Sequence, residues 1–163
     1  MFTSAVFAQK VTTSKFGDIS YKMTQMQVAT LTPDKLAVYD VNNPEMPEHE
    51  IEINEIKYHI SYYKNLVDKR FDVYEVSSTS SKLSTLSGIK IGSSLDDLWK
   101  VYKKYDISVQ DILEDNETKS VRTFTINDLD NGCTLNFYLK NNKIVKMALV
   151  NESGFLNNYI YEN

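Results

Sequence analysis

The chain has 163 residues, of which 42% are hydrophobic and 25% are charged, and this length and composition fit one globular domain with its own core. It carries 18 Lys and Arg against 22 Asp and Glu, giving a net charge of −4. This charge argues against nucleic acid as a partner, because neutralising phosphates requires clustered cations. No stretch is long and apolar enough for a transmembrane helix. The sign of the charge instead suits another protein, a basic one, as the partner.

The first eight residues are mostly small or apolar, and the Val-Phe-Ala that ends them before Gln9 resembles the cleavage site of a secretory signal peptide. The charged region and most of the hydrophobic region of such a signal are missing. We interpret residues 1–8 as a signal-peptide remnant, which predicts a periplasmic or secreted protein. If they are instead a short apolar first strand, the protein would be cytoplasmic. Residues 9–163 then form the single domain.

The first half of this domain, residues 16–83, is rich in strand patterns. Four segments favour strands, with the cleanest alternation in the third: 19–28, 35–41, 50–63 and 70–78. Residues 42–50 contain Pro44 and Pro47 and are predicted to form an exposed loop, because proline cannot join the interior of a sheet. No helix is expected in this half beyond a turn at 65–69.

The second half, residues 84–151, has the clearest pattern: a strand, a tight loop, a helix and a hairpin. The phrase Gly88-Ile-Lys-Ile-Gly92-Ser-Ser94 precedes an amphipathic helix over residues 94–105. Its apolar residues recur on one face at helical spacing: Leu95, Leu98, Trp99, Tyr102 and Tyr105. Ser94 is the predicted N-cap, and the acid three positions later resembles a capping box.

After the helix, residues 106–119 indicate a polar connection with one further turn near 109–113. Strands are predicted at 121–129, 133–139 and 143–151, joined by tight turns at Asn-Gly and Asn-Asn. The apolar face of the helix and the apolar face of this meander would each supply half of one hydrophobic core. We therefore predict an α+β fold, in which one main amphipathic helix packs on an antiparallel sheet with a C-terminal β-meander. No sequence identity between the halves indicates an internal duplication.

Few residues suggest chemistry. His49 lies in the predicted proline-containing loop and His59 on a strand, and both are expected on the surface or on a sheet face, without the spacing of metal ligands. Cys133 alternates with apolar residues and indicates a small core residue, although a pairing with either histidine stays open. Gly88 and Gly92 lack the lysine of a phosphate-binding loop. We predict no enzymatic activity, no metal and no cofactor.

The eleven tyrosines are the compositional feature that most favours binding, because tyrosine supplies rigid contact area with a polar tip. The alternative, that most are half-buried sheet residues, stays open. The candidate partner-binding residues lie on the strands of the first half and in its proline-containing loop: Tyr58, His59, Tyr62, Tyr63, Tyr74, Glu45 and Glu48.

Residues 86–150 carry a resemblance to known proteins. The Gly88-Ile-Lys-Ile-Gly92-Ser-Ser94 phrase, the strand at 134–139 and the strand at 142–147 are similar to a pattern in small bacterial envelope proteins. That pattern resembles the β-lactamase-inhibitor-protein-like and outer-membrane-assembly-lipoprotein-like folds. The resemblance implies a helix packed on an antiparallel hairpin, and a non-catalytic protein that binds other proteins. The chain lacks the lipoprotein cysteine near its start.

Together these observations favour a non-enzymatic, secreted or periplasmic protein-binding module, an inhibitor or immunity protein that neutralises a toxin or a hydrolase. One alternative is an envelope assembly or scaffold component. Another is a small-molecule-binding or enzymatic α+β domain, which would need a deep pocket gathering His59, tyrosines or carboxylates.

Overall fold

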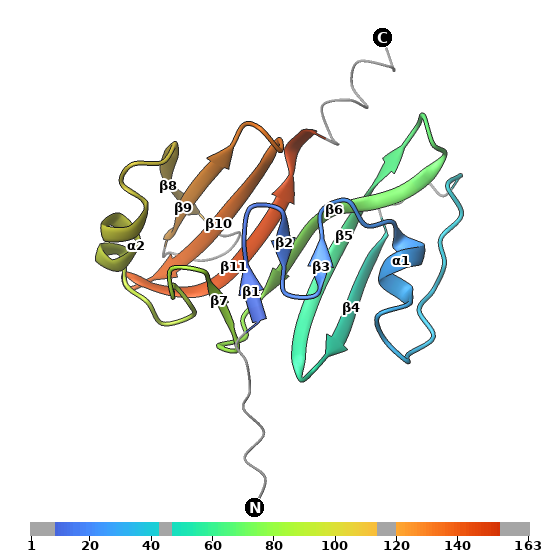
Figure 1. Ribbon diagram of the computed structural model, residues 1–163, viewed down its shortest axis with the longest axis horizontal. Coiled ribbons are helices and arrows are strands. Elements are labelled where there is room, and N and C mark those ends of the chain that lie inside the picture. Colours follow the sequence, from blue (N-terminus) through green and yellow to red (C-terminus); the bar gives the residue numbers. More distant parts are fainter. Residues whose placement is uncertain (1–8, 43–46, 114–119, 154–163) are drawn as a thin grey trace, which may run out of the picture.

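The computed structural model describes residues 9–42, 47–113 and 120–153. These residues form two β-sheets and two short helices (Figure 1). The small sheet has the order β3-β2-β1-β7 and consists of β1 (Gln9–Val11), β2 (Lys15–Phe16), β3 (Ile19–Ser20) and β7 (Leu83–Thr85). The large sheet has the order β4-β5-β6-β11-β10-β9-β8 and consists of β4 (Glu48–Ile53), β5 (Ile56–Asn65), β6 (Arg70–Ser78), β8 (Ile107–Leu113), β9 (Ser120–Asp128), β10 (Cys133–Lys140) and β11 (Lys143–Asn151). The helices are α1 (Gln25–Ala29) and α2 (Leu95–Tyr102).

The expected α+β class is wrong, because the protein is mostly β and no main helix organises it. The segment expected as a polar connection pairs with β9 as strand β8. The single strand expected at 50–63 is two strands, which turn at Asn54 and Glu55 with φ angles of 52° and 61°. The seven-stranded sheet is therefore the organising element, and it contains strands from both halves of the chain.

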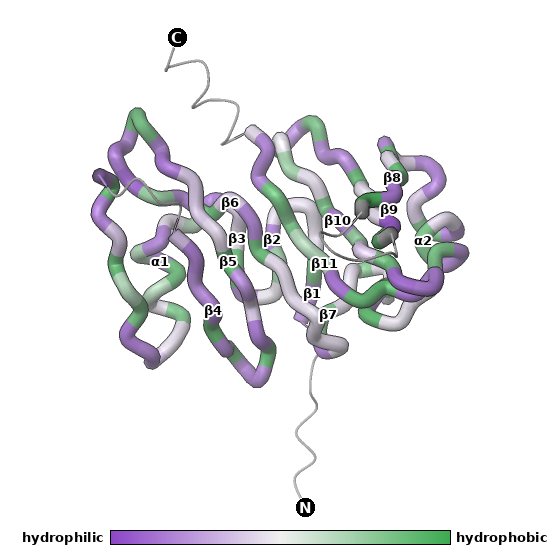
Figure 2. Tube along the Cα trace, turned by 180° about the vertical axis from the view of Figure 1, so that it is seen from behind, coloured by the Kyte–Doolittle hydropathy of each residue, from purple (hydrophilic) through white to green (hydrophobic). Residues whose placement is uncertain are grey.

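The core lies between the large sheet and a second layer formed by the small sheet and the two helices (Figure 1). Along the strands of the large sheet, hydrophilic and hydrophobic residues alternate, so one face enters the core (Figure 2). From α2, Leu98 is fully buried and the ring of Tyr102 lies 5.9 Å from that of Phe137 on β10. From the small sheet, the Phe16 ring meets Tyr58 of β5 edge to face at 6.4 Å.

The expected strand at 19–28 is also wrong over most of its length. Strand β3 ends at Ser20, and α1 follows, because Thr24 accepts a hydrogen bond from the backbone of Gln27 while the Gln27 side chain accepts one from the Thr24 backbone. This capping box starts a helix despite the alternating residues before it. Residues 35–41 form no strand.

The two halves repeat one order of elements: a short hairpin, a capped helix and three antiparallel strands. The first half supplies β2–β3, α1 and β4–β6, and the second supplies β7 with its bridge to Lys90, then α2 and β9–β11. The two N-cap residues, Thr24 and Ser94, each belong to a capping box. Each also forms an isolated β-bridge with the third strand of its own repeat, Thr24 with Asp72 and Ser94 with Lys143.

The two repeats meet at the centre of the large sheet. The third strands, β6 and β11, pair antiparallel at the centre of the large sheet. Strand β1 pairs antiparallel with β2 and parallel with β7, so it lies between the two hairpins. Strand β8 is an additional edge strand of the second repeat. The repeat is thus visible in the order of the elements, although no sequence identity between the halves indicates it.

Candidate functional site

The candidate site is the face of the large sheet that points away from the core, which we call the open face. The pairing between neighbouring strands places one residue of each strand in a row across this face. From β4 to β8 the row is Glu50, His59, Ser77, Ala148, Asn136, Thr125 and Ser108. All of these residues except Ala148 are polar. Ser77 and Ala148, at the centre of the row, are buried, so its exposed and partly exposed residues lie in two groups, on β4–β5 and on β8–β10.

The alternation of β10 explains how the sequence builds this face. Its core-facing residues are almost fully buried: Cys133, Leu135, Phe137 and Leu139. The residues between them, Thr134, Asn136 and Tyr138, are partly exposed on the opposite side. The neighbouring strand β9 places Thr123, Thr125 and Asn127 directly beside them. Hydroxyl and amide groups thus cover the β8–β10 half of the open face.

A hollow of about 300 Å³ lies in this half, lined by side chains of β8, β9 and β10 and by Glu152, which follows β11. Three polar atoms in its lining are buried and have no hydrogen-bond partner among the described residues: Thr123 Oγ1, Thr134 Oγ1 and Asn136 Oδ1. A buried polar atom without a partner costs roughly 1–3 kcal/mol. A bound group that paired with these atoms, after small side-chain rotations, would remove that cost.

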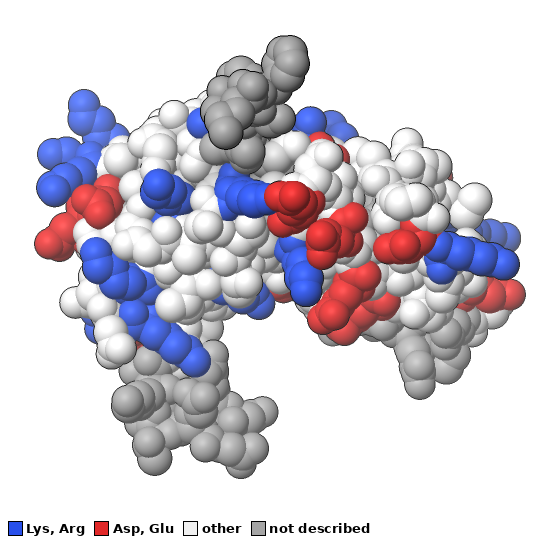
Figure 3. All heavy atoms as spheres, turned by 90° about the horizontal axis from the view of Figure 1, so that it is seen from below, with Lys and Arg blue, Asp and Glu red and all other residues white. Residues whose placement is uncertain are grey.

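The β4–β6 half of the open face is acidic. Strand β4 exposes Glu48, Glu50 and Glu52 in alternation with buried residues. Lys146 and Glu75 form an ion pair of 3.7 Å between β11 and β6. Figure 3 shows the acidic side chains gathered over the β4–β5 end, whereas Lys and Arg are more frequent at the end that carries α2.

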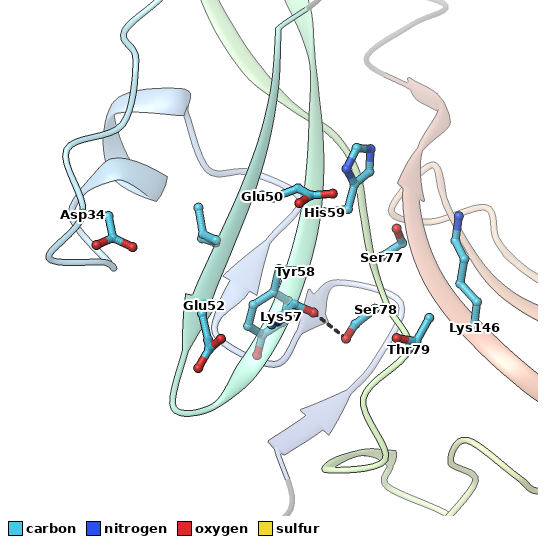
Figure 4. Close-up of a pocket in the computed structure, with 11 residues that line it drawn as sticks. Asp34, Glu50, Glu52, Lys57, Tyr58, His59, Ser77, Ser78, Thr79 and Lys146 are labelled. Carbon is cyan, nitrogen blue, oxygen red and sulfur yellow. Dashed lines mark hydrogen bonds between the residues drawn. The ribbon is translucent and has the colours of Figure 1, made fainter.

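A second hollow, of about 500 Å³, lies beside β4, β5 and β6 (Figure 4). In it Glu50 and His59 lie side by side, and Ser77 and Lys146 lie across from them (Figure 4). The hydroxyl of Ser78 donates a 2.6 Å hydrogen bond to the Lys57 carbonyl oxygen at its base. This hollow combines carboxylate, imidazole, hydroxyl and ammonium groups in one place.

The structure buries three of the tyrosines predicted to bind a partner. Tyr58 and Tyr62 are 1% and 0% exposed on the core-facing side of β5, and Tyr63 is also buried. Burial raises the pKa of Tyr58 and of Tyr63 to about 12, and raises that of Tyr62 further. These side chains hold the fold together and offer no contact area to a partner.

The other predicted binding residues lie differently. His59 and Glu48 are on the open face, with their side chains 41% and 60% exposed and 3.7 Å apart. Tyr74 is partly exposed on β6. Glu45 lies outside the described residues. The open face thus brings together two of the predicted residues and adds the hydroxyl and amide cluster that sequence reasoning missed.

Two residues considered for catalysis are held in the interior. His49, expected on the surface or on a sheet face, is buried on β4, with Nδ1 3.0 Å from the Tyr62 hydroxyl and Nε2 2.9 Å from the Ala37 carbonyl oxygen. Cys133 is 1% exposed, and its burial raises the thiol pKa to about 12. A thiol with this pKa stays protonated at neutral pH and is a poor nucleophile.

Among residues 9–42, 47–113 and 120–153, no group of three or more His, Cys, Asp or Glu side chains is arranged to hold a metal ion. None of the helices in the same ranges is both long and apolar enough to cross a membrane.

No protein-family model matches the chain, and no curated protein and no solved structure shows a significant similarity to it.

Proposed function

We propose that the protein is a non-enzymatic binding module that uses the open face to bind and neutralise another protein, as an inhibitor or immunity protein does, in the periplasm or outside the cell. The observation that carries the proposal is the row of residues that spans all seven strands and is polar at every position except Ala148, together with the buried polar atoms of Thr123, Thr134 and Asn136 that have no partner among the described residues. Antibody binding sites likewise use serine and asparagine for adaptable hydrogen bonds and tyrosine for rigid contact area.

The dimensions of the open face support this proposal. Seven adjacent strands, spaced about 4.8 Å apart, make a face about 30 Å wide. A standard protein interface needs roughly 800 Å² from each partner. One partner could therefore be bound on this face without help from a second surface.

The charges of the open face indicate which charges the partner should carry. Glu48, Glu50 and Glu52 line one side of it, so the partner should present Lys or Arg to β4 and β5. The β8–β10 half should meet uncharged hydrogen-bonding groups. Complementary charge raises the rate of association and favours one orientation of the partner.

The experiment that tests the proposal compares variants of the open face. The wild-type chain, expressed in its native host, should co-purify with one partner in a stoichiometric complex. Thr125→Arg and His59→Arg place bulky cations on the open face and should each weaken that complex at least tenfold. The control Val67→Arg changes a residue that is 68% exposed in the β5–β6 turn and should leave the complex intact. Equal binding by all four proteins, or no specific partner, would refute the proposal.

One observation favours a second candidate function, the binding of a small polar molecule. The hollow beside His59 has a volume of about 500 Å³, within the usual range for small-molecule sites. This candidate predicts that a soluble metabolite raises the melting temperature of the wild-type protein, and that His59→Ala removes the effect. A panel of polar metabolites that leaves the melting temperature unchanged would reject it.

A further inference from the structure

An open groove of about 560 Å³ lies on the core-facing side of the large sheet, away from the open face. It is bounded by the small sheet, by the end of α2 and by the β9–β10 turn. Its floor consists of buried apolar side chains: Val11, Tyr102, Ile126 and Leu135. These floor residues belong to the core, so the groove keeps its shape without a ligand.

Three large apolar side chains form the rim of this groove and are exposed. Leu86 is 74% exposed, Tyr105 is 61% exposed and Leu129 is 83% exposed. They come from three separate segments: the turn after β7, the residues after α2 and the β9–β10 turn. Single exposed apolar residues are common, but the convergence of three on one groove is typical of a docking surface.

The groove is also acidic. Asp106, Asp128 and Asp130 line it, and none of its described lining residues is Lys or Arg. Asp128 accepts hydrogen bonds from the Thr13 hydroxyl and from the backbone and side-chain nitrogens of Asn131, and these bonds lower its pKa. The other two carboxylates are exposed. An occupant must therefore bring positive charge together with apolar surface.

We infer that this groove is a second docking site, which binds a segment of a partner protein that combines a large apolar side chain with adjacent Lys or Arg residues. A polypeptide segment suits it better than a small molecule. Small-molecule sites enclose most of their ligand, whereas the exposed rim here can be covered only by an occupant that extends beyond the groove. The inference does not rest on the open face, because Asn127 is the single described residue that lines both this groove and the β8–β10 hollow.

The test uses a displayed library of random peptides selected on the wild-type protein and depleted on the Leu86→Ser/Leu129→Ser double variant. Peptides specific for the wild type should combine apolar residues with Lys or Arg. The strongest of them, synthesised with a fluorescent label, should bind the double variant at least tenfold more weakly in an anisotropy titration. Both substitutions are on exposed side chains, so the variant should retain the thermal midpoint of the wild type.

A second variant tests the charge. Asp106→Asn/Asp130→Asn leaves the apolar rim intact and should weaken the peptide at least threefold at low salt, with a smaller difference at high salt. The control Val67→Ser/Asp96→Asn changes an exposed apolar residue and an exposed carboxylate elsewhere and should bind as the wild type does. Thr125→Arg on the open face should also bind normally, which separates this site from the proposed function.

Two results would overturn the inference. One is a selection in which no peptide distinguishes the wild type from the Leu86→Ser/Leu129→Ser variant. The other is a set of specific peptides that lack Lys and Arg, or whose affinity is the same for the wild type and the Asp106→Asn/Asp130→Asn variant.

Discussion

His49 and Tyr62 are joined by a buried hydrogen bond of 3.0 Å between Nδ1 and the phenol hydroxyl. The other ring nitrogen, Nε2, lies 2.9 Å from the Ala37 carbonyl oxygen. Because a carbonyl can only accept, Nε2 carries the proton, and Nδ1 accepts from the hydroxyl. The neutral imidazole thus fastens the loop that contains Ala37 to strands β4 and β5. A second proton on the ring would remove the acceptor that Tyr62 uses.

The first prediction concerns this histidine and pH. Burial lowers the pKa of His49 below 6.5, although its bond to Ala37 opposes the shift. The His49 imidazole therefore binds a proton more readily in the unfolded chain than in the folded chain. The resulting stabilisation is complete above pH 6.5 and is lost as the pH falls through the lowered pKa of the folded state. Urea unfolding should show a free energy of unfolding that declines between pH 7 and pH 5.

The control for that prediction is a pair of substitutions. His49→Gln removes the titrating ring and should flatten the decline, whereas His59→Gln, on the open face, should retain it. A decline that is equally steep in wild type and His49→Gln would contradict the assignment.

The second prediction concerns the two capping boxes. Ser94 and Thr24 each accept a hydrogen bond from the backbone of the residue three positions later. Replacing either by alanine should lower the free energy of unfolding by about 1 kcal/mol. Urea unfolding of both variants checks the values, with the exposed Thr79→Ala as the control. Losses of similar size would agree with the equivalence of the two helices, whereas no loss at either position would contradict the capping geometry.

The third prediction compares two glycines that occupy equivalent hairpins. Gly17 has φ of +61° and a Cβ placed there would collide with the Tyr58 hydroxyl, whereas Gly88 has φ of +85° and faces open space. Gly88→Ala should cost only the strain of a positive φ, roughly 1–2 kcal/mol. Gly17→Ala should cost clearly more, because the collision adds to that strain. Thermal unfolding of both variants tests this order, and equal losses would contradict it.

The fourth prediction concerns the thiol. Burial raises the pKa of Cys133 to about 12, so the thiolate is scarce at pH 8. A thiol reagent such as a disulfide dye should react with the folded protein far more slowly than with the chain in 8 M urea. Reaction of the folded protein at the rate of a free thiol would show that Cys133 is accessible and would reopen its candidacy as a nucleophile.

The parts of the fold that the sequence predicted correctly are those with strong local signals. Strand β6 lies at the predicted residues 70–78, and β11 lies at the predicted 143–151. Helix α2 begins where the capping box of Ser94 predicted, but it ends at Tyr102, three residues early. Strand β8 was missed because its polar residues, Ser108, Gln110 and Asp111, made the segment look like a polar connection. Helix α1 was missed because five residues are too few to show helical periodicity.

The binding surface was harder to predict than the fold. Tyr58 and Tyr62 lie on the same side of β5 as Ile60, and His59 lies on the opposite side. This alternation in the sequence already predicted that the two tyrosines face the core. Composition, which suggested that tyrosines form the interface, was the weaker guide. The polar side of β9 and β10 was present in the alternation, but no residue pattern distinguishes an uncovered binding face from a merely solvated one. Only the pairing of seven strands brings these residues together.

The most direct test of the open face as the binding surface is hydroxyl-radical footprinting of the complex with the co-purified partner. Tyr138 and His59 lie on that face, whereas Trp99, 42% exposed on α2, lies on the other side of the sheet. The proposal predicts that oxidation of Tyr138 and His59 falls several-fold in the complex while that of Trp99 is unchanged. Equal oxidation of Tyr138 and His59 in the free and bound protein would contradict it.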